Sequence, residues 1–127
     1  MPIVPYAAGG KRQSVPPKKG VNVDLPLKVP FLPEFKERLL SERKTATTRT
    51  YLLGMAPTVF EAFGARFVFT GLLHLPLMII AERYYWEEGF EEPDGFIKIW
   101  ERIHPIAGWQ PGRFVYFHTF KKVGRSQ

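Results

Sequence analysis

The chain has 127 residues, of which 45% are hydrophobic, and a formal net charge of +6. This length and apolar content predict one folded domain with an attached segment, and they exclude a chain that is disordered throughout. There is no cysteine, and no apolar run approaches the ~20 residues of a membrane-spanning helix. We therefore expect no disulfide, no metal site, no cofactor and no membrane partner. Prolines and glycines stand where a signal peptide would be apolar, which predicts a cytoplasmic location.

Residues 1–30 are expected to form a basic extended arm. They contain six prolines, three glycines and five Lys or Arg residues, against one carboxylate, Asp24. This composition disfavours regular helix and interior strand. Apolar residues alternate over 21–29, which predicts that this part lies along the domain as an edge strand. The arm's charge suits either attraction to nucleic acid or solubilisation, and both uses stay open. Its other candidate use is to join copies of the chain into a homo-oligomer.

The domain, residues 31–127, is predicted to begin with a helix over 33–43. Pro33 suits a first helical turn, and Phe35 and Leu39 lie one turn apart on the apolar stripe. A hydroxyl-rich strand, 44–49, follows. Segments rich in Val, Phe and Thr then predict two strands, 58–63 and 66–73, joined by a turn at Gly64-Ala65.

The C-terminal part is predicted to hold two helices and a last strand. One helix covers about 81–88 and stops at Gly89, and the next covers about 95–104 after Asp94 as its N-cap. The strand 113–120 is apolar or aromatic on both faces, which predicts a buried closing strand. This order indicates an α+β fold in which five or six strands form a small barrel with two or three short helices.

The segment Lys44–Arg49 is the candidate site, because two cations bracket three threonines within six residues. On a strand, Thr45, Thr47 and Arg49 share one face, while Lys44 sits at the corner with the preceding helix. Hydroxyls and cations on one face suit a phosphate, a carboxylate or a polarised carbonyl. The alternative interpretation is a solvated edge strand, since such strands commonly carry Lys and Arg.

Four motifs in this order resemble an ASCH domain of the PUA-like superfamily. They are Lys44–Arg49, Glu87–Phe90, Phe96–Trp100 and Val115–Phe120. The resemblance covers about residues 31–122 and leaves the arm outside. It implies a small β-barrel decorated by helices, with a cleft lined by the 44–49 segment that takes RNA or a nucleobase-like ligand.

The resemblance also implies roles for single residues. One bacterial branch of the family hydrolyses acetylated cytidine with a lysine, a threonine and a glutamate, which match Lys44, Thr47 and Glu88; a ribonuclease activity is associated with other members. Two departures stand out: Glu42 replaces the glycine that usually ends the helix, and Met55 replaces the aspartate of a Gly-Asp turn. We expect the fold to persist, with a changed cleft and ligand.

The leading functional hypothesis is binding of RNA or a nucleotide-like ligand. Lys44 and Arg49 would contact a phosphate or a base edge, Thr45 and Thr47 would add hydrogen bonds, and Trp109 in a Gly/Pro-rich loop would stack on a base. The alternative is an amidohydrolase acting on acetylcytidine or a similar modified nucleoside, so the question of enzyme activity stays open.

In that alternative, Thr47 attacks the acyl carbonyl, Lys44 acts as its base once its pKa is lowered, and Glu88 moves a proton to the leaving amine. A ribonuclease would need His74, His104 and His118, which are far apart in sequence. His118 is interpreted as a core histidine.

Overall fold

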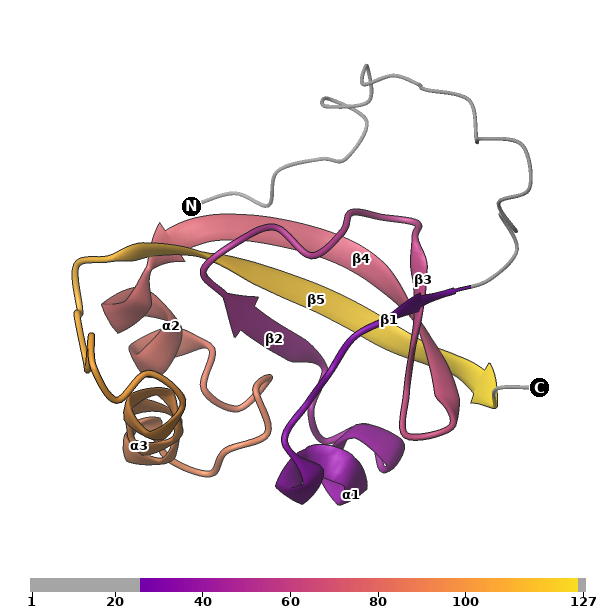
Figure 1. The fold of residues 1–127 in the computed structure, drawn as a ribbon, viewed down its shortest axis with the longest axis horizontal. Helices are drawn as coiled ribbons and strands as arrows, with labels where there is room; N and C mark the ends of the chain where they lie inside the picture. Colours follow the sequence, from indigo (N-terminus) through magenta and orange to yellow (C-terminus); the bar gives the residue numbers. More distant parts are fainter. Residues whose placement is uncertain (1–25, 126–127) are drawn as a thin grey trace, which may run out of the picture.

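The computed structural model describes residues 26–125, in which short helices pack against one curled β-sheet (Figure 1). The strands are β1 (Leu27–Lys28), β2 (Ala46–Arg49), β3 (Val59–Ala62), β4 (Ala65–Pro76) and β5 (Phe114–Arg125). The helices are α1 (Lys36–Leu40), α2 (Leu77–Arg83) and α3 (Pro93–Ile103), and a 3₁₀ turn, η2 (Pro33–Phe35), leads into α1. The predicted arm lies outside the described residues except for its last five positions.

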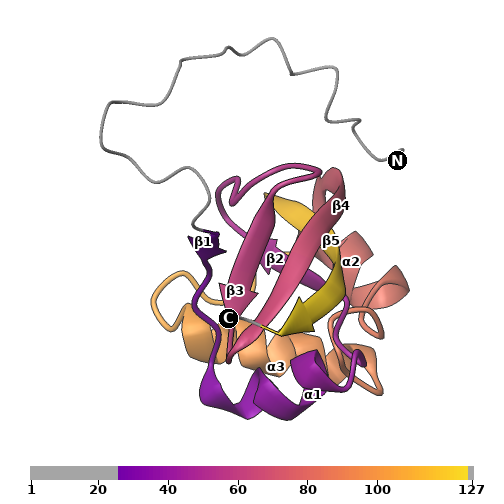
Figure 2. The ribbon, with the colours of Figure 1, turned by 90° about the vertical axis from the view of Figure 1, so that its right-hand side faces the viewer.

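The strands run in the order β1-β3-β4-β5-β2. The long antiparallel pair of β4 and β5 forms the middle of the sheet, and β1 pairs in parallel with β3. The α+β class, the five strands and the short helices are as predicted. The sheet curls strongly but stays open between its edge strands β1 and β2 (Figure 2), so the expected barrel is not closed. The physical reason is the shortness of β1, which has only two residues. Pro26 and Pro30 flank it, and because proline has no backbone N–H, neither can extend the ladder of hydrogen bonds.

Two apolar clusters fill the two faces of the sheet. The first packs α1 against the curled end, and its members include Phe35, Leu39, Phe60, Phe67, Phe69 and Phe120. The second packs α2 and α3 against the other face, and its members include Leu73, Leu77, Ile80, Phe96, Trp100, Val115 and Phe117. Because Phe120 and Phe117 of β5 belong to different clusters, the predicted burial of both faces of this strand is confirmed.

The boundaries of several elements differ from the prediction. The helix predicted over 33–43 is a 3₁₀ turn followed by only five α-helical residues. Helix α2 begins at Leu77 instead of 81, because Pro76 ends β4 in an extended conformation and serves as the N-cap of α2. Leu77 and Ile80, which follow the predicted strand 66–73 as part of the same apolar run, thus belong to the buried face of a helix. The β3–β4 turn is centred on Phe63 and Gly64, which both have positive φ, as a tight hairpin turn requires.

Candidate functional site

A cavity of about 380 Å³ lies between the segment that follows β1, strand β2 and helix α3. Its walls are mostly apolar, and its polar groups come from the segment 44–51, which contains β2, from Glu88 in the loop before α3 and from His104 after α3. The lining residues are Pro30, Phe31, Leu32, Phe35, Lys44, Thr47, Thr48, Arg49, Thr50, Tyr51, Glu88, Phe90, Phe96, Ile99, Trp100, Ile103 and His104. Apolar walls with a few convergent polar groups are typical of small-molecule sites.

A buried ion pair forms part of the polar wall. Lys44 and Glu88 are 2% and 3% exposed, and Lys44 Nζ lies 2.9 Å from Glu88 Oε1. The same amine donates to the backbone carbonyls of Ala46, at 2.8 Å, and Glu88, at 3.2 Å. The hydroxyl of Thr48 donates to Glu88 Oε2. Both carboxylate oxygens therefore have a donor, as a buried charge requires.

Backbone geometry brings Lys44 to Glu88. Glu42 adopts a left-handed conformation, with φ of 66°, and the Lys44 N–H then donates to the carbonyl of Arg38 at 2.9 Å. The N–H groups of Thr45 and Ala46 both donate to the Glu87 carbonyl, at 2.7 and 3.0 Å. The chain thus has a left-handed helix end with glutamate at the position where the ASCH domains that it resembles usually have glycine.

Gly89 permits this close approach of the two segments. Its φ is +96°, and a Cβ added there would lie 3.2 Å from both the Lys44 Cβ and the Arg38 Cδ. A side chain would therefore be strained by its backbone conformation and crowded by its neighbours. Glycine next to Glu88 lets the carboxylate reach the ammonium group.

Opposing effects set the charge of Lys44. Burial lowers its pKa, and the adjacent carboxylate of Glu88 opposes this effect. The three acceptors around Nζ match the three N–H groups of an ammonium ion. The ring of Phe35, whose centroid is 4.6 Å from Nζ, adds a cation–π contact. In this arrangement Lys44 is a fixed, paired cation.

Arg49 and Thr47 form the second polar group of the cavity. Arg49 Nε donates to Thr47 Oγ1 at 3.4 Å, and its Nη2 donates to the Pro30 carbonyl at 2.7 Å. Its guanidinium carbon lies 5.1 Å from the centroid of the Phe31 ring. Burial lowers the pKa of Arg49, which nevertheless stays a cation at neutral pH. Since Thr47 Oγ1 accepts the Arg49 bond, its own O–H can donate to a ligand.

His118 holds the strand that carries these residues. Its ring is fully buried, its Nδ1 lies 3.3 Å from the Thr47 carbonyl, and its Nε2 accepts the Leu53 N–H at 2.9 Å. This pattern requires a neutral ring with the proton on Nδ1. Burial lowers the pKa of His118 to about 4, so the neutral form persists at physiological pH. The interpretation of His118 as a core histidine is confirmed.

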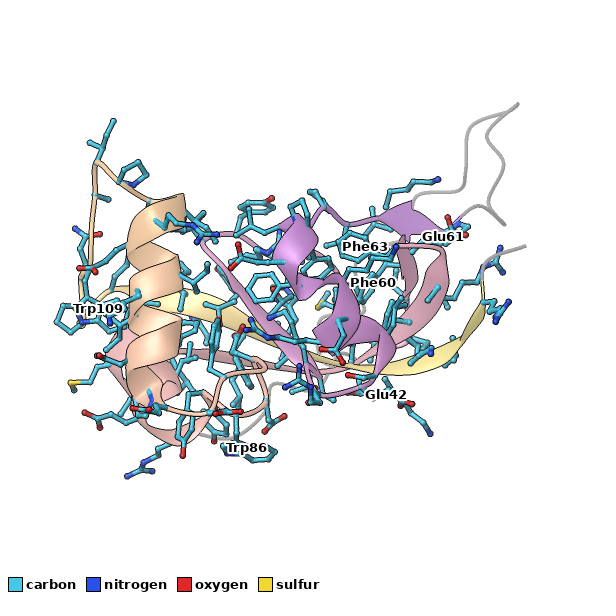
Figure 3. The ribbon with its side chains drawn as sticks, turned by 90° about the horizontal axis from the view of Figure 1, so that it is seen from below. Glu42, Phe60, Glu61, Phe63, Trp86 and Trp109 are labelled. Atoms are coloured by element: carbon cyan, nitrogen blue, oxygen red, sulfur yellow. The ribbon has the colours of Figure 1, made fainter. Side chains whose placement is uncertain are left out.

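Four of the six residues predicted for the site line the cavity: Lys44, Thr47, Arg49 and Glu88. The structure does not bring the other two to it. Thr45 is bound through its backbone to Glu87 and Phe120. Trp109 packs on Phe96, with ring centroids 6.2 Å apart, at the outer side of α3 (Figure 3).

Sequence reasoning missed Thr48, which binds Glu88 directly. The alternation of the strand contained the signal: Lys44, Ala46 and Thr48 are spaced two residues apart, which places Thr48 on the same face as Lys44. Phe35 was missed as a cavity residue because it was assigned only to helix packing, and Phe31 was given no role in the prediction. Within residues 26–125, no group of three His, Asp or Glu side chains could hold a metal ion, and no helix is long and apolar enough to cross a membrane.

Comparison with known proteins identifies the fold. No family model and no curated protein sequence matches the chain. A DUF984 protein of Enterococcus faecalis matches in structure with a TM-score of 0.64 and 15% identity, over 84% of this chain and 86% of its own. An ASCH domain of Lactobacillus crispatus matches with a TM-score of 0.61 and 11% identity, over 80% and 81% of the two chains.

Proposed function

We propose that this chain, which has the fold of an ASCH domain, binds RNA or a nucleotide-like ligand in the cavity beside Lys44, Thr47, Arg49 and Glu88. The observation that carries the proposal is the pairing of aromatic walls with one polar side. A planar heterocycle can bury its faces against Phe and Trp side chains and form hydrogen bonds along its edge. The ASCH-like fold supports the same class of ligand.

The charges of the cavity favour a ligand with oxygen acceptors. Lys44 and Glu88 neutralise each other, which leaves Arg49 as the uncompensated cation of the polar side. A guanidinium presents several N–H groups in a plane, so it suits a phosphate or the carbonyl edge of a base. Thr47 lies next to it and adds a hydroxyl donor.

The test is a calorimetric titration of the full chain with nucleosides and nucleoside monophosphates. Arg49→Ala should weaken binding at least about tenfold, because a hydrogen bond to a charged group contributes about 1.5–3 kcal/mol. Arg43→Ala is the matched control, since it removes one cation outside the cavity from an exposed pair with Glu37. It should leave binding unchanged. Absence of binding to any of these ligands, or equal effects of the two variants, would contradict the proposal.

Hydrolysis of a modified nucleoside such as acetylcytidine is the second candidate. One observation favours it: burial lowers the pKa of Lys44, and Lys44 contacts Glu88, the other charged residue of the family's hydrolytic set. One observation weighs against it. Lys44 Nζ already donates to three acceptors, so it must release one and lose a proton before it can accept the proton of Thr47.

The hydrolysis test compares two threonines. Purified protein incubated with acetylcytidine should release cytidine, and Thr47→Val should abolish release while Thr45→Val, which lies outside the cavity, should not. No release at high enzyme concentration would exclude this candidate and leave the binding proposal intact.

The remaining expectations concern the basic arm and the location of the protein. We infer that residues 1–30 add salt-dependent affinity for RNA, because Lys and Arg neutralise phosphates. If deletion of this segment removes all RNA binding while Arg49→Ala has no effect, the affinity belongs to the arm. Assembly through the arm and a cytoplasmic location stay predictions.

A further inference from the structure

Three aromatic rings gather at the end of the sheet where β4 stops and β5 begins. We call this group the end platform; its members are His74, Phe114 and Tyr116. The rings of His74 and Tyr116 stack with centroids 4.4 Å apart and planes 7° apart. Phe114 meets His74 edge-on, with centroids 5.4 Å apart. Cross-strand packing explains the His74–Tyr116 pair, because the two residues are opposite one another in the β4–β5 ladder.

Packing within the domain does not explain the exposure of two of these rings. Phe114 is 52% exposed, and His74 is exposed as well. Single exposed apolar residues are ordinary, but several aromatic rings at one place usually mark an interaction surface.

The end platform is continuous with the cavity. Tyr116 is opposite Arg49 in the β2–β5 ladder and opposite His74 in the β4–β5 ladder, so these three side chains point to the same face of the sheet. Tyr51, two residues after Arg49, lines the cavity and is 57% exposed, so an aromatic ring also lies at the mouth of the cavity. Figure 1 shows the end of β2 directed toward the side of the sheet where β4 ends and β5 begins. A chain that leaves the cavity past Arg49 therefore meets the platform.

The charges around the platform favour a polyanion. Two cations lie beside the platform, since Arg113 directly precedes Phe114 and Arg49 is opposite Tyr116 in the β2–β5 ladder. Strands β4 and β5 contain no carboxylate, and their own cations lie at the other end of the ladder, where Arg66 is opposite Gly124. The carboxylates concentrate in the segment 82–101, which packs on the opposite face of the sheet and contains seven of them. A polyanion would thus be attracted to the platform by Arg49 and Arg113 and repelled from the helical side.

We propose that the end platform stacks bases of a single-stranded RNA whose neighbouring nucleotide occupies the cavity. This inference rests on the proposed function and narrows its ligand from a free nucleotide to a strand. Aromatic side chains stack on any base, and the nearby cations bind phosphates without reading sequence. We therefore expect little sequence preference at the platform.

The test compares two ligands and a matched pair of variants. Fluorescence anisotropy measures binding of the full chain to a short labelled single-stranded oligoribonucleotide of mixed sequence, and calorimetry measures binding of nucleoside monophosphates. Phe114→Ala should weaken oligoribonucleotide binding about 5- to 100-fold, as for the loss of one stacked base, and leave monophosphate binding unchanged. The control is Trp86→Ala, which removes an equally exposed aromatic ring from the carboxylate-rich segment (Figure 3). It should change neither affinity.

His74→Ala is a second variant that removes a different ring of the platform and should weaken only the oligoribonucleotide. The inference is overturned if the oligoribonucleotide binds no more tightly than a monophosphate, or if Phe114→Ala and Trp86→Ala act alike. It is also overturned if Phe114→Ala converts a dimer into a monomer without affecting RNA, because a second copy would then cover the platform. If the unmodified chain binds neither the oligoribonucleotide nor the monophosphates, the proposed function itself is refuted.

Discussion

The buried neutral ring of His118 makes the stability of the domain dependent on pH in a definite direction. Burial lowers the pKa of this residue from 6.5 to about 4, and the positive charge of Arg49 acts in the same direction. As the pH falls below 6.5, the unfolded chain takes up the proton first, while the folded chain resists protonation until about pH 4. The contribution of the neutral His118 to the free energy of unfolding is therefore fully present above pH 6.5 and is lost as the pH falls from 6.5 to about 4.

The magnitude follows from the size of the shift. A difference of about 2.5 pKa units corresponds to a loss of about 3 kcal/mol from His118 alone, at about 1.4 kcal/mol per unit. This loss is a large fraction of the total stability of an ordinary domain. Protonation of His118 would also disturb the candidate site, because a protonated Nε2 could no longer accept the hydrogen bond from the N–H of Leu53.

The assay is urea denaturation near neutral pH and near pH 4 for the unmodified chain and for His118→Gln. Acidic groups also titrate in this range, so the informative quantity is the difference between the two chains. The variant should start less stable, because it loses the hydrogen bond to the Thr47 carbonyl, but should lose about 3 kcal/mol less on acidification. His74→Gln, at an exposed histidine, should keep the pH dependence of the unmodified chain. Equal losses for the unmodified chain and His118→Gln would refute this reasoning.

Three further predictions concern the residues that hold the ion pair. Glu42→Gly should raise the free energy of unfolding by about 0.5–1 kcal/mol in urea denaturation, because glycine adopts the left-handed conformation without strain; Glu42→Ala should bring no such gain. Thr48→Val should lower the free energy of unfolding by about 1–3 kcal/mol, because it removes one hydrogen-bond donor of the buried Glu88 carboxylate. An unchanged midpoint of urea denaturation would contradict this role of Thr48. Gly89→Ala should lower the melting temperature, whereas Gly112→Ala, where no atom lies within 4 Å of the added carbon, should be tolerated.

Local sequence patterns predicted the class of the fold but not how its sheet ends. The alternation of β5 and the stripe of α3 depend on neighbouring residues, so periodicity identifies them. The start of α2 depended instead on Pro76, which can end a strand or precede a helix, and only the packing of Leu77 and Ile80 on the sheet decides between them. Whether the sheet closes depends on β1, where alternation predicted an edge strand but could not show which residues pair or whether the strand reaches β2.

The candidate site was predictable to the extent that it depends on a motif. Lys44, Thr47 and Arg49 are close in sequence, but Glu88 follows Lys44 by 44 residues. No periodicity predicts a contact between residues so far apart. Glu88 was placed in the site with Lys44 only because the order of the motifs resembles that of ASCH domains. Trp109 was favoured because its loop is rich in Gly and Pro, but a contact with Phe96 engages its ring. Sequence composition does not reveal such a contact.

The open edge between β1 and β2 explains why there is room for the cavity. In a closed barrel, a ladder of backbone hydrogen bonds would join these two edges and hold the strands about 4.8 Å apart. Here the contact from β2 to the segment after β1 is made by a side chain, through the bond from Arg49 to the Pro30 carbonyl. The cavity occupies the width that the missing ladder leaves. The side chain of Arg49 therefore spans this opening, and its movement would break no backbone pairing of the sheet.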